Sequence, residues 1–325
     1  MEKYITLTLS PDSAPSTVDQ VLRTQGHLTK KQISRAKFLP DGIQKNGIRC
    51  RVAETVHPGD EIRVCLETEE TDSPQLLPSS ASLLPEIVYE DQDILAVNKP
   101  SGILTHPSGV HYADTLSNQV AAYFQNKKVS VRVRPVGRLD KETSGIVLFA
   151  KNQVAAQRLQ MQREEHFFQK EYLAVVEGYL PKDSADTWHT ISFPLKKVSD
   201  HPLRMQTVTD ESNSDTAENS TVLFPAVTHY CTLYSTTNWS LISLRLDTGR
   251  THQIRIHMKA LGHPLLGDTL YHDSSSMLSD GQPAFYRTAL HAWKVTFRQP
   301  FEGNKITLTG KLPEDFLQVA SYLSG

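Results

Sequence analysis

The chain has 325 residues, a length typical of two domains, and its 38% hydrophobic and 22% charged residues are typical of a folded globular protein. With 34 Lys and Arg against 36 Asp and Glu, the net charge is −2, and no overall basic excess points to a nucleic acid. The three cysteines are widely spaced, which argues against a disulfide framework or a cysteine zinc site. No long apolar run or signal peptide is evident, so we expect a soluble, cytoplasmic protein that does not bind a membrane.

Charge is distributed unevenly along the chain. Residues 16–66 contain nine basic and five acidic residues, a local excess of +4. Residues 64–98 contain eight acidic residues and no Lys or Arg, and their part from 72 to 85 is rich in Ser, Pro and Leu, as linkers are. We therefore expect a small basic domain over residues 1–66, an acidic and polar linker over 67–85, and a larger domain over 86–325.

The basic region has recognisable helix and hairpin signals. Thr17 with Gln20 and Thr29 with Gln32 form two capping boxes, each of which predicts the start of a short helix. Asn46-Gly47 predicts a tight hairpin, and residues 62–66 predict a strand. Bases on the second helix and the first hairpin suit a phosphate backbone, although a solvated protein face would carry similar charges. The candidate RNA-binding residues are Lys30, Lys31, Arg35, Lys45 and Arg49.

The region after residue 85 alternates between strands and single helices. Apolar patterns predict two strands within residues 86–98, and further strands over 145–150, 172–177 and 241–246. Helices are predicted over about 152–165 and 251–261, and the polar residues 210–220 predict a loop. Strands mixed with single helices indicate an α+β fold rather than a regular βαβ series.

Asp140 is the strongest candidate for chemistry. It is the lone acid among six bases that fall within fifteen residues. Nearby positive charge favours the ionised form of a carboxylate, which can then act as a nucleophile or a base. An ion pair that merely fixes a loop would give the same pattern. The six bases are Lys127, Lys128, Arg132, Arg134, Arg138 and Lys141.

The histidines give little reason to expect a metal ion. His252 and His257 are five residues apart, about 140° around a helix, so they do not share a face. The other histidines of this region lie in separate segments, without metal-ligand spacing. Arg255, in contrast, could present its planar fork to a carboxylate or a phosphate. We therefore expect no metal.

Several motifs, in order along residues 85–316, resemble the RluA family of RNA pseudouridine synthases. Arg138-Leu139-Asp140 with Thr143-Ser144-Gly145 resembles the catalytic motif of the family, and residues 248–257 resemble its second signature. The basic region resembles, more loosely, an RNA-binding module of the ribosomal-protein S-four type. One departure is Gly137, where many family members carry a His. Further motifs are matched by residues 98–102, 170–174, 262–268 and 290–292.

The resemblance implies an RNA uridine isomerase, built on a mixed, largely antiparallel sheet flanked by helices. The enzyme would flip the uridine out of its stack, break the N-glycosidic bond and rejoin the base through carbon five, without a cofactor. Asp140 would be the essential carboxylate, adding to carbon six of the uracil or assisting at the ribose, and Arg255 would pair with it. Tyr172 would stack on the uracil and help to move the proton from carbon five. Arg138 would fill the gap left by the flipped nucleotide or hold a phosphate, and Arg250 would also bind substrate.

The partner implied is RNA, ribosomal or transfer, and the protein would act in rRNA or tRNA processing. The sequence does not select the uridine. The first alternative is a non-catalytic RNA-binding or ribosome-assembly protein, against which the joint presence of Asp140, Tyr172 and Arg255 counts. A metal-dependent hydrolase that uses the scattered histidines is the second alternative. Coiled-coil heptads are absent, which favours a monomer.

Overall fold

The structure is a computed structural model of the whole chain. The expected loop over residues 210–220 lies outside the described residues, as does most of the expected linker over 67–85. No helix in the described part is long and apolar enough to cross a membrane. The residues described are 3–66, 76–78, 84–129, 131–184, 187–198, 204–208, 222–272 and 285–320.

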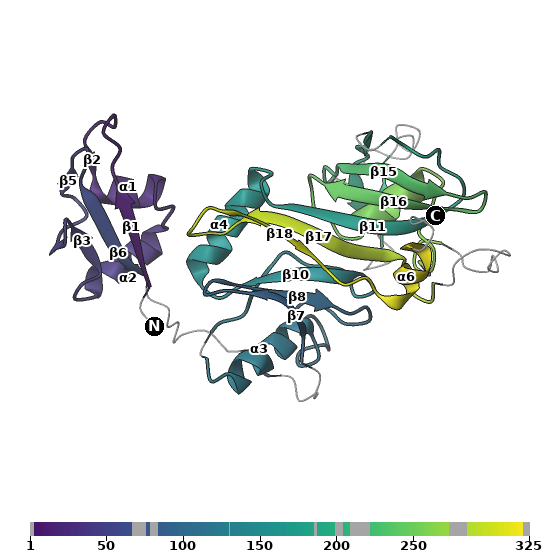
Figure 1. Cartoon of the computed structure of the whole chain (residues 1–325), viewed down its shortest axis with the longest axis horizontal. Helices are drawn as coiled ribbons and strands as arrows, with labels where there is room; N and C mark the ends of the chain where they lie inside the picture. The colour runs from purple at the N-terminus through teal and green to yellow at the C-terminus, as the bar shows by residue number, and fades with distance from the viewer. Residues whose placement is uncertain are drawn as a thin grey trace.

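Residues 3–66, the N-terminal region, form two helices and a four-stranded sheet of order β1-β6-β3-β4, seen at the left of Figure 1. Both predicted capping boxes are present, at Thr17 and Thr29. The predicted hairpin is also present, with positive φ angles of 51° at Asn46 and 78° at Gly47, as a two-residue turn requires. The elements are β1 (Lys3–Thr8), β2 (Ser16–Thr17), α1 (Val18–Thr24), α2 (Lys30–Phe38), β3 (Ile43–Lys45), β4 (Ile48–Arg49), β5 (Thr55–Val56) and β6 (Glu61–Leu66).

The core of the N-terminal region is completed by the first helix after β10, α4 (Gln153–Glu164). Val154 of this helix belongs to the same apolar cluster as the buried residues of α1 and α2. The side chains of Gln157 and Arg158 donate hydrogen bonds to the carbonyls of His27 and Gly26, at 2.7 and 3.2 Å. The N-terminal region therefore rests on α4, the nearest helix of the larger body in Figure 1.

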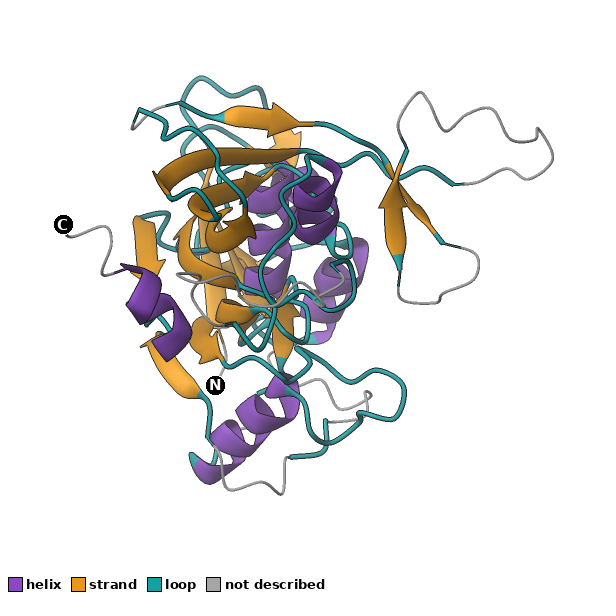
Figure 2. Cartoon of the chain, turned by 90° about the vertical axis from the view of Figure 1, so that its right-hand side faces the viewer, coloured by secondary structure: helices purple, strands orange, loops and turns teal. Residues whose placement is uncertain are grey.

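The larger body is organised around one mixed sheet of order β12-β15-β16-β11-β17-β10-β8-β7, with β18 paired to β17 and β9 to β10. Among the described strand pairs of this sheet, β10–β17 is parallel and the others are antiparallel. A separate ribbon, β13–β14, projects from the body in Figure 2. The strands are β7 (Glu86–Glu90), β8 (Ile94–Lys99), β9 (Arg134–Val136), β10 (Ser144–Ala150), β11 (Gln169–Glu177), β12 (His189–Ile191), β13 (Leu195–Lys197), β14 (Met205–Thr207), β15 (Thr228–Ser235), β16 (Trp239–Leu246), β17 (Leu290–Arg298) and β18 (Lys305–Thr309).

Helices cover both faces of the sheet because successive strand residues point to opposite sides. On one face, Leu95 and Val97 of β8 pack in one cluster with α3 (Leu116–Asn126) and α5 (Gln253–Ala260). On the other face, Ile94 and Ala96 pack in another cluster with α4, and α6 (Glu314–Ala320) covers β11 and β16. All seven residues of β10 are buried. The predicted α+β fold, with a largely antiparallel sheet flanked by helices, is confirmed.

Candidate active site

A cavity of about 880 Å³ opens beside the loop that precedes β10. Its walls come from the loop itself, from the C-terminal half of α4, from β11, and from residues 245–255 at the end of β16 and the start of α5. The structure thus brings together side chains that are more than a hundred residues apart in the sequence. Five sequence-predicted residues line this cavity: Arg138, Asp140, Tyr172, Arg250 and Arg255.

The loop that carries Asp140, residues 137–143, is held by a buried lysine. Lys99 is 1% exposed, and its Nζ donates hydrogen bonds to the carbonyls of Pro100, Ile103 and Lys141 at 2.9, 2.8 and 2.9 Å. Burial lowers the pKa of Lys99 to about 7, an effect that the nearby negative charge of Asp140 opposes. Lys99 therefore ties the residue after Asp140 to the segment that follows β8.

Hydroxyl groups hold the same loop on either side of Asp140. The buried Thr105 hydroxyl donates to the Leu139 carbonyl and accepts from the Leu139 amide, both at 3.0 Å. The Ser101 hydroxyl donates to the Glu142 carbonyl at 2.8 Å. Residues 98–102 match a family motif, but the motif by itself assigns Lys99 and Ser101 no role. The sequence feature that could have predicted this role is the position of Lys99 at the end of an apolar strand. A lysine is rarely fully buried without partners, so a buried one there indicates that it binds other groups.

Gly145 allows the loop to pass directly into the parallel strand pair. Its φ is +115°, in a region that side-chain-bearing residues rarely adopt. A Cβ atom at this position would lie 2.2 Å from the carbonyl oxygen of Ala292 on β17. Glycine is therefore required for β10 to lie against β17 immediately after the Asp140 loop.

The Asp140 side chain is half-buried and unpaired among the described residues. Within the described part of the chain its carboxylate accepts no hydrogen bond and pairs with no base. Its backbone carbonyl accepts from the amide of Thr143 at 3.2 Å, which closes the loop. Arg138, two residues earlier, is exposed, and its guanidinium donates to the Thr251 hydroxyl at 3.4 Å. This contact connects the Asp140 loop with the segment before α5.

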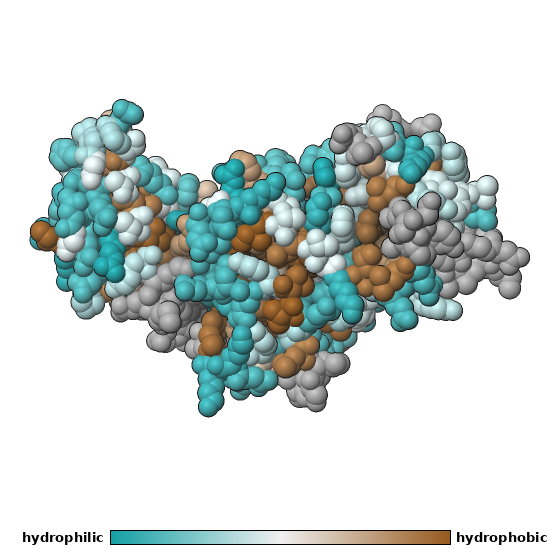
Figure 3. All heavy atoms as spheres, viewed as in Figure 1, coloured by the Kyte–Doolittle hydropathy of each residue, from teal (hydrophilic) through white to brown (hydrophobic). Residues whose placement is uncertain are grey.

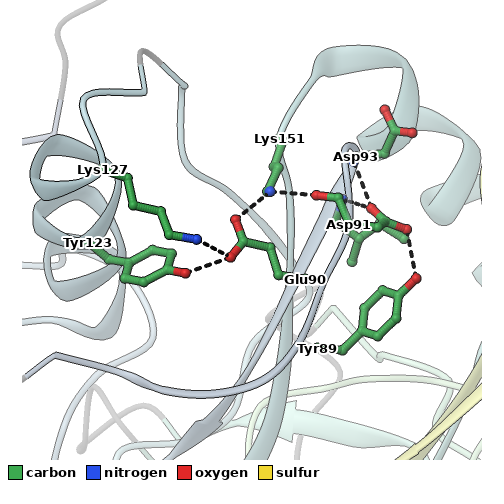
Figure 4. Close-up of polar contacts among 8 residues, drawn as sticks. Tyr89, Glu90, Asp91, Asp93, Tyr123, Lys127 and Lys151 are labelled. Carbon is green, nitrogen blue, oxygen red and sulfur yellow. Dashed lines mark hydrogen bonds and ion pairs between the residues drawn. The ribbon is translucent and has the colours of Figure 1, made fainter.

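Lys127, one of the six bases close to Asp140 in the sequence, does not line the cavity. That residue lies at the end of α3 and pairs with Glu90 of β7 at 2.7 Å, together with Lys151 at 2.6 Å (Figure 4). Burial of Glu90 opposes its ionisation, but hydrogen bonds from Lys127, Lys151 and Tyr123 outweigh this effect and lower its pKa to about 2. The reason is that α3 carries residue 127 to the opposite end of β7 and β8. The cluster joins these elements and takes no part in the cavity.

The predicted ion pair between Arg255 and Asp140 is wrong. Arg255 donates from Nε and Nη2 to both oxygens of Asp268, at 2.7 and 2.6 Å, and both side chains are buried. Burial opposes the charge of Arg255, yet Asp268 and, more weakly, Asp140 raise its pKa. Asp140 therefore acts on Arg255 through its charge, while Asp268 fixes the guanidinium in the cavity wall. The sequence contained Asp268 at the end of a motif, without a sign that it faces Arg255.

Tyr172 is 7% exposed and points into the cavity from β11. Burial and the negative charge of Asp140 raise the pKa of this phenol, so the hydroxyl is neutral at ordinary pH. Lys170, two residues earlier on the same side of the strand, also lines the cavity and donates to the Ile146 carbonyl at 3.2 Å. Burial, together with the nearby positive charge of Arg163, lowers the pKa of Lys170 to about 7.

A tight turn presents Arg250 at the start of α5. The Gln253 side chain accepts hydrogen bonds from the Thr248 hydroxyl and the Arg250 amide, at 2.8 and 3.0 Å, which fixes the turn. His252 begins the helix with a left-handed φ of 54° and contacts the Tyr271 hydroxyl at 2.9 Å. His257 points elsewhere, to Thr228 and Phe193, so the two histidines do not converge. Strain of this kind often accompanies functional turns.

The five candidates in the N-terminal region lie away from the cavity. Lys30, Lys31 and Arg49 are exposed, and Arg35 and Lys45 are half-buried. Arg49 donates to the Lys37 carbonyl at 3.2 Å and Lys45 to the Thr55 carbonyl at 3.0 Å, so the hairpin and α2 are held together. We call these five residues the basic face.

The fold and the site define a class of protein. A strand-built cavity with a free carboxylate, a neutral phenol and several arginines suits an enzyme that acts on a polyanionic substrate without a Ser or Cys nucleophile. Residues 93–260 match the family model described as RNA pseudouridylate synthase, and the chain belongs to this family. It is accordingly an RNA uridine isomerase, as the resemblance to the RluA family indicated.

Two curated relatives and one solved structure illustrate the match. The chain is 30% identical over 327 residues to ribosomal large subunit pseudouridine synthase D of Nitrosomonas europaea, covering 97% of this chain and 86% of that one. It is 35% identical over 239 residues to tRNA pseudouridine synthase C of Haemophilus ducreyi, covering 71% of this chain and 92% of that one. The structure of human RNA pseudouridylate synthase domain containing 4 covers 74% of this chain and 93% of its own, with a TM-score of 0.57 and 23% identity. It has the same fold.

Proposed function

We propose that Asp140 is the essential carboxylate of this uridine isomerase. The observation that supports this proposal is the environment of Asp140. Residues on both sides of Asp140 are held by buried groups, Lys99 and Thr105, while its own carboxylate has no partner among the described residues. Such an arrangement fixes a reactive group in the cavity and leaves it available to the substrate.

The cavity residues have complementary roles in the rearrangement. The N-glycosidic bond of the flipped uridine breaks, the uracil rotates, carbon five joins the ribose, and the proton of carbon five is lost as the ring nitrogen gains one. Asp140 adds to carbon six of the uracil or assists at the ribose. The neutral Tyr172 stacks on the base and relays the proton from carbon five. Arg255, fixed by Asp268, places a positive charge beside the anionic intermediate.

The test is release of tritium from RNA labelled at carbon five of uridine, because this hydrogen leaves when carbon five joins the ribose. Total RNA from cells that lack the protein supplies unmodified sites. We expect the wild-type chain to release tritium and Asp140→Asn, which is nearly isosteric, to release less than about a thousandth as fast, since nucleophile removal commonly costs this much or more. An Asp140→Asn variant as active as wild type would disprove the assignment. Tight RNA binding without release by the wild type would favour the non-catalytic alternative.

We infer that the substrate is ribosomal rather than transfer RNA. The relative named for large-subunit ribosomal RNA matches 97% of this chain, whereas the relative named for tRNA is matched over 92% of its own length but only 71% of this chain. The tRNA relative therefore has little room for a counterpart of the N-terminal region. Fractionating the labelled RNA before the assay tests this choice. Release confined to the tRNA fraction would overturn it.

We further propose that the N-terminal region is an RNA-binding domain of the S-four type. The basic face lies beside Phe38 and Ile48, which are 84% and 74% exposed. Exposed aromatic and apolar groups among bases suit the unpaired bases and phosphates of a folded RNA. Figure 3 shows that the visible surface of this region is otherwise mostly hydrophilic, which makes these apolar residues more notable.

A further inference from the structure

Arg163 also lines the cavity, together with Arg138, Arg250 and Arg255, at a position that the sequence did not single out. Arg163 lies near the C-terminal end of α4, the helix on which the N-terminal region rests. The only hydrogen bond of its guanidinium among the described residues is a long one of 3.4 Å to the Gln160 side chain, one turn earlier in the same helix. The side chain is half-buried rather than extended into solvent.

Two glycines leave the space that the Arg163 guanidinium occupies. A Cβ atom at Gly137 would lie 3.4 Å from Nη1, and a Cβ atom at Gly249 would lie 3.4 Å from Nη2. These are van der Waals contact distances, so the guanidinium lies directly against both glycines. Gly137 begins the Asp140 loop, and Gly249 lies in the turn that presents Arg250. Arg163 therefore bridges the two loops that form the cavity walls.

The positive charge of Arg163 has no carboxylate partner within the described part of the chain. The contrast with its neighbours is clear, because Arg255 is paired with Asp268 at 2.6 Å and Arg245 with Glu171 at 3.3 Å. The charge nevertheless reaches the site, since Arg163 lowers the pKa of Lys170 and opposes the rise in the pKa of Tyr172 that burial and Asp140 cause. A half-buried guanidinium without an anion is ready to receive one from the substrate.

We propose that Arg163 binds a phosphate of the RNA strand next to the flipped uridine. The proposal rests on the function proposed above, because it takes RNA as the occupant of the cavity. A guanidinium matches a phosphate in two parallel hydrogen bonds, and glycines on both sides let the RNA backbone approach it closely. The docking of the N-terminal region on α4 fixes the helix that carries Arg163.

Arg163→Met and Arg163→Lys test this role, with Lys305→Met as a control that removes an exposed positive charge from β18. Kinetics are measured by tritium release from the same RNA at several salt concentrations. We expect Arg163→Met to raise KM about tenfold or more, because a charged hydrogen bond is worth roughly 1.5–3 kcal/mol, with kcat within about twofold. The slope of log KM against log salt should fall by about 0.7, the value for one phosphate of a single strand. Arg163→Lys should recover part of the affinity, and Lys305→Met should match the wild type.

Binding measurements in the Asp140→Asn background separate failure of this proposal from failure of the proposed function. There Arg163→Met should still weaken RNA binding and lower the salt slope, whether or not the wild-type chain releases tritium. An unchanged affinity and slope would overturn phosphate binding. A loss of kcat with unchanged KM would also overturn it, because the guanidinium would then act on the reacting base. Equal effects from Lys305→Met would show general charge attraction and overturn it as well.

Discussion

Around the Asp140 loop, Lys99 and Thr105 are buried and have fixed partners, whereas on the basic face Lys30, Lys31 and Arg49 are exposed. Lys99 shows the first arrangement, with three carbonyl acceptors and 1% exposure. Lys30 and Lys31 show the second, because both are exposed and neither side chain has a hydrogen bond or ion pair within the described part of the chain. A reacting group needs a defined position, which buried hydrogen bonds provide. Attraction to an RNA backbone needs charge at the surface, which tolerates imprecise placement.

Among the substitutions that test this contrast, we expect Lys99→Met to have the largest effect on the rate of tritium release. The substitution removes three hydrogen bonds and lets the Asp140 loop move, and a displacement of about 1 Å can cost roughly a hundredfold in rate. We expect tritium release to fall by about that factor, together with a lower melting temperature. Lys305→Met, which removes an exposed charge, should leave both unchanged. Full activity of Lys99→Met would show that the loop does not depend on this clamp.

A smaller effect is expected when Lys30, Lys31 and Arg35 are changed together to Ala. Losing three phosphate contacts should raise KM for RNA and lower the salt slope by roughly 2, at about 0.7 per contact. The kcat and melting temperature should stay close to wild type, because these side chains lie away from the cavity. A fall in kcat with an unchanged KM would contradict this contrast between the Asp140 loop and the basic face, because the basic face would then affect the chemistry.

The smallest effect concerns Glu90, a partly buried group outside both regions. Its pKa is lowered to about 2 in the folded chain, so its contribution to stability is fully present above its unfolded pKa, about 4.3. The contribution is lost as the pH falls towards 2, where the folded chain also binds the proton. Glu90→Gln should therefore lower the melting temperature slightly at pH 7 and less at pH 3. A difference that grew on acidification would contradict the assignment.

Local features of the fold could be predicted because they depend on neighbours in sequence. The capping boxes at Thr17 and Thr29 and the hairpin at Asn46-Gly47 are confirmed, since each is formed by residues within one turn. The helix expected over 152–165 is confirmed as α4. The cytoplasmic location and the monomeric state stay predictions.

Partners distant in sequence could not be predicted from local patterns. Arg255 was identified as a fork for an anion, but its anion is Asp268 rather than Asp140. Lys127 was counted with Asp140 because they are close in sequence, but α3 carries it to Glu90. Motif matches identified the residues of the cavity without showing which of them touch.

Ordered motifs and local periodicity were enough to predict the family, the α+β class and the candidates Asp140, Tyr172 and Arg255, because both can be read along the chain. Only the folded chain shows that Lys99 and Thr105 hold the Asp140 loop, that Asp268 fixes Arg255, and that Arg163 lies between Gly137 and Gly249. Burial and ion pairing depend on which strands and helices become neighbours. That choice is made by packing of the whole sheet rather than by any short segment.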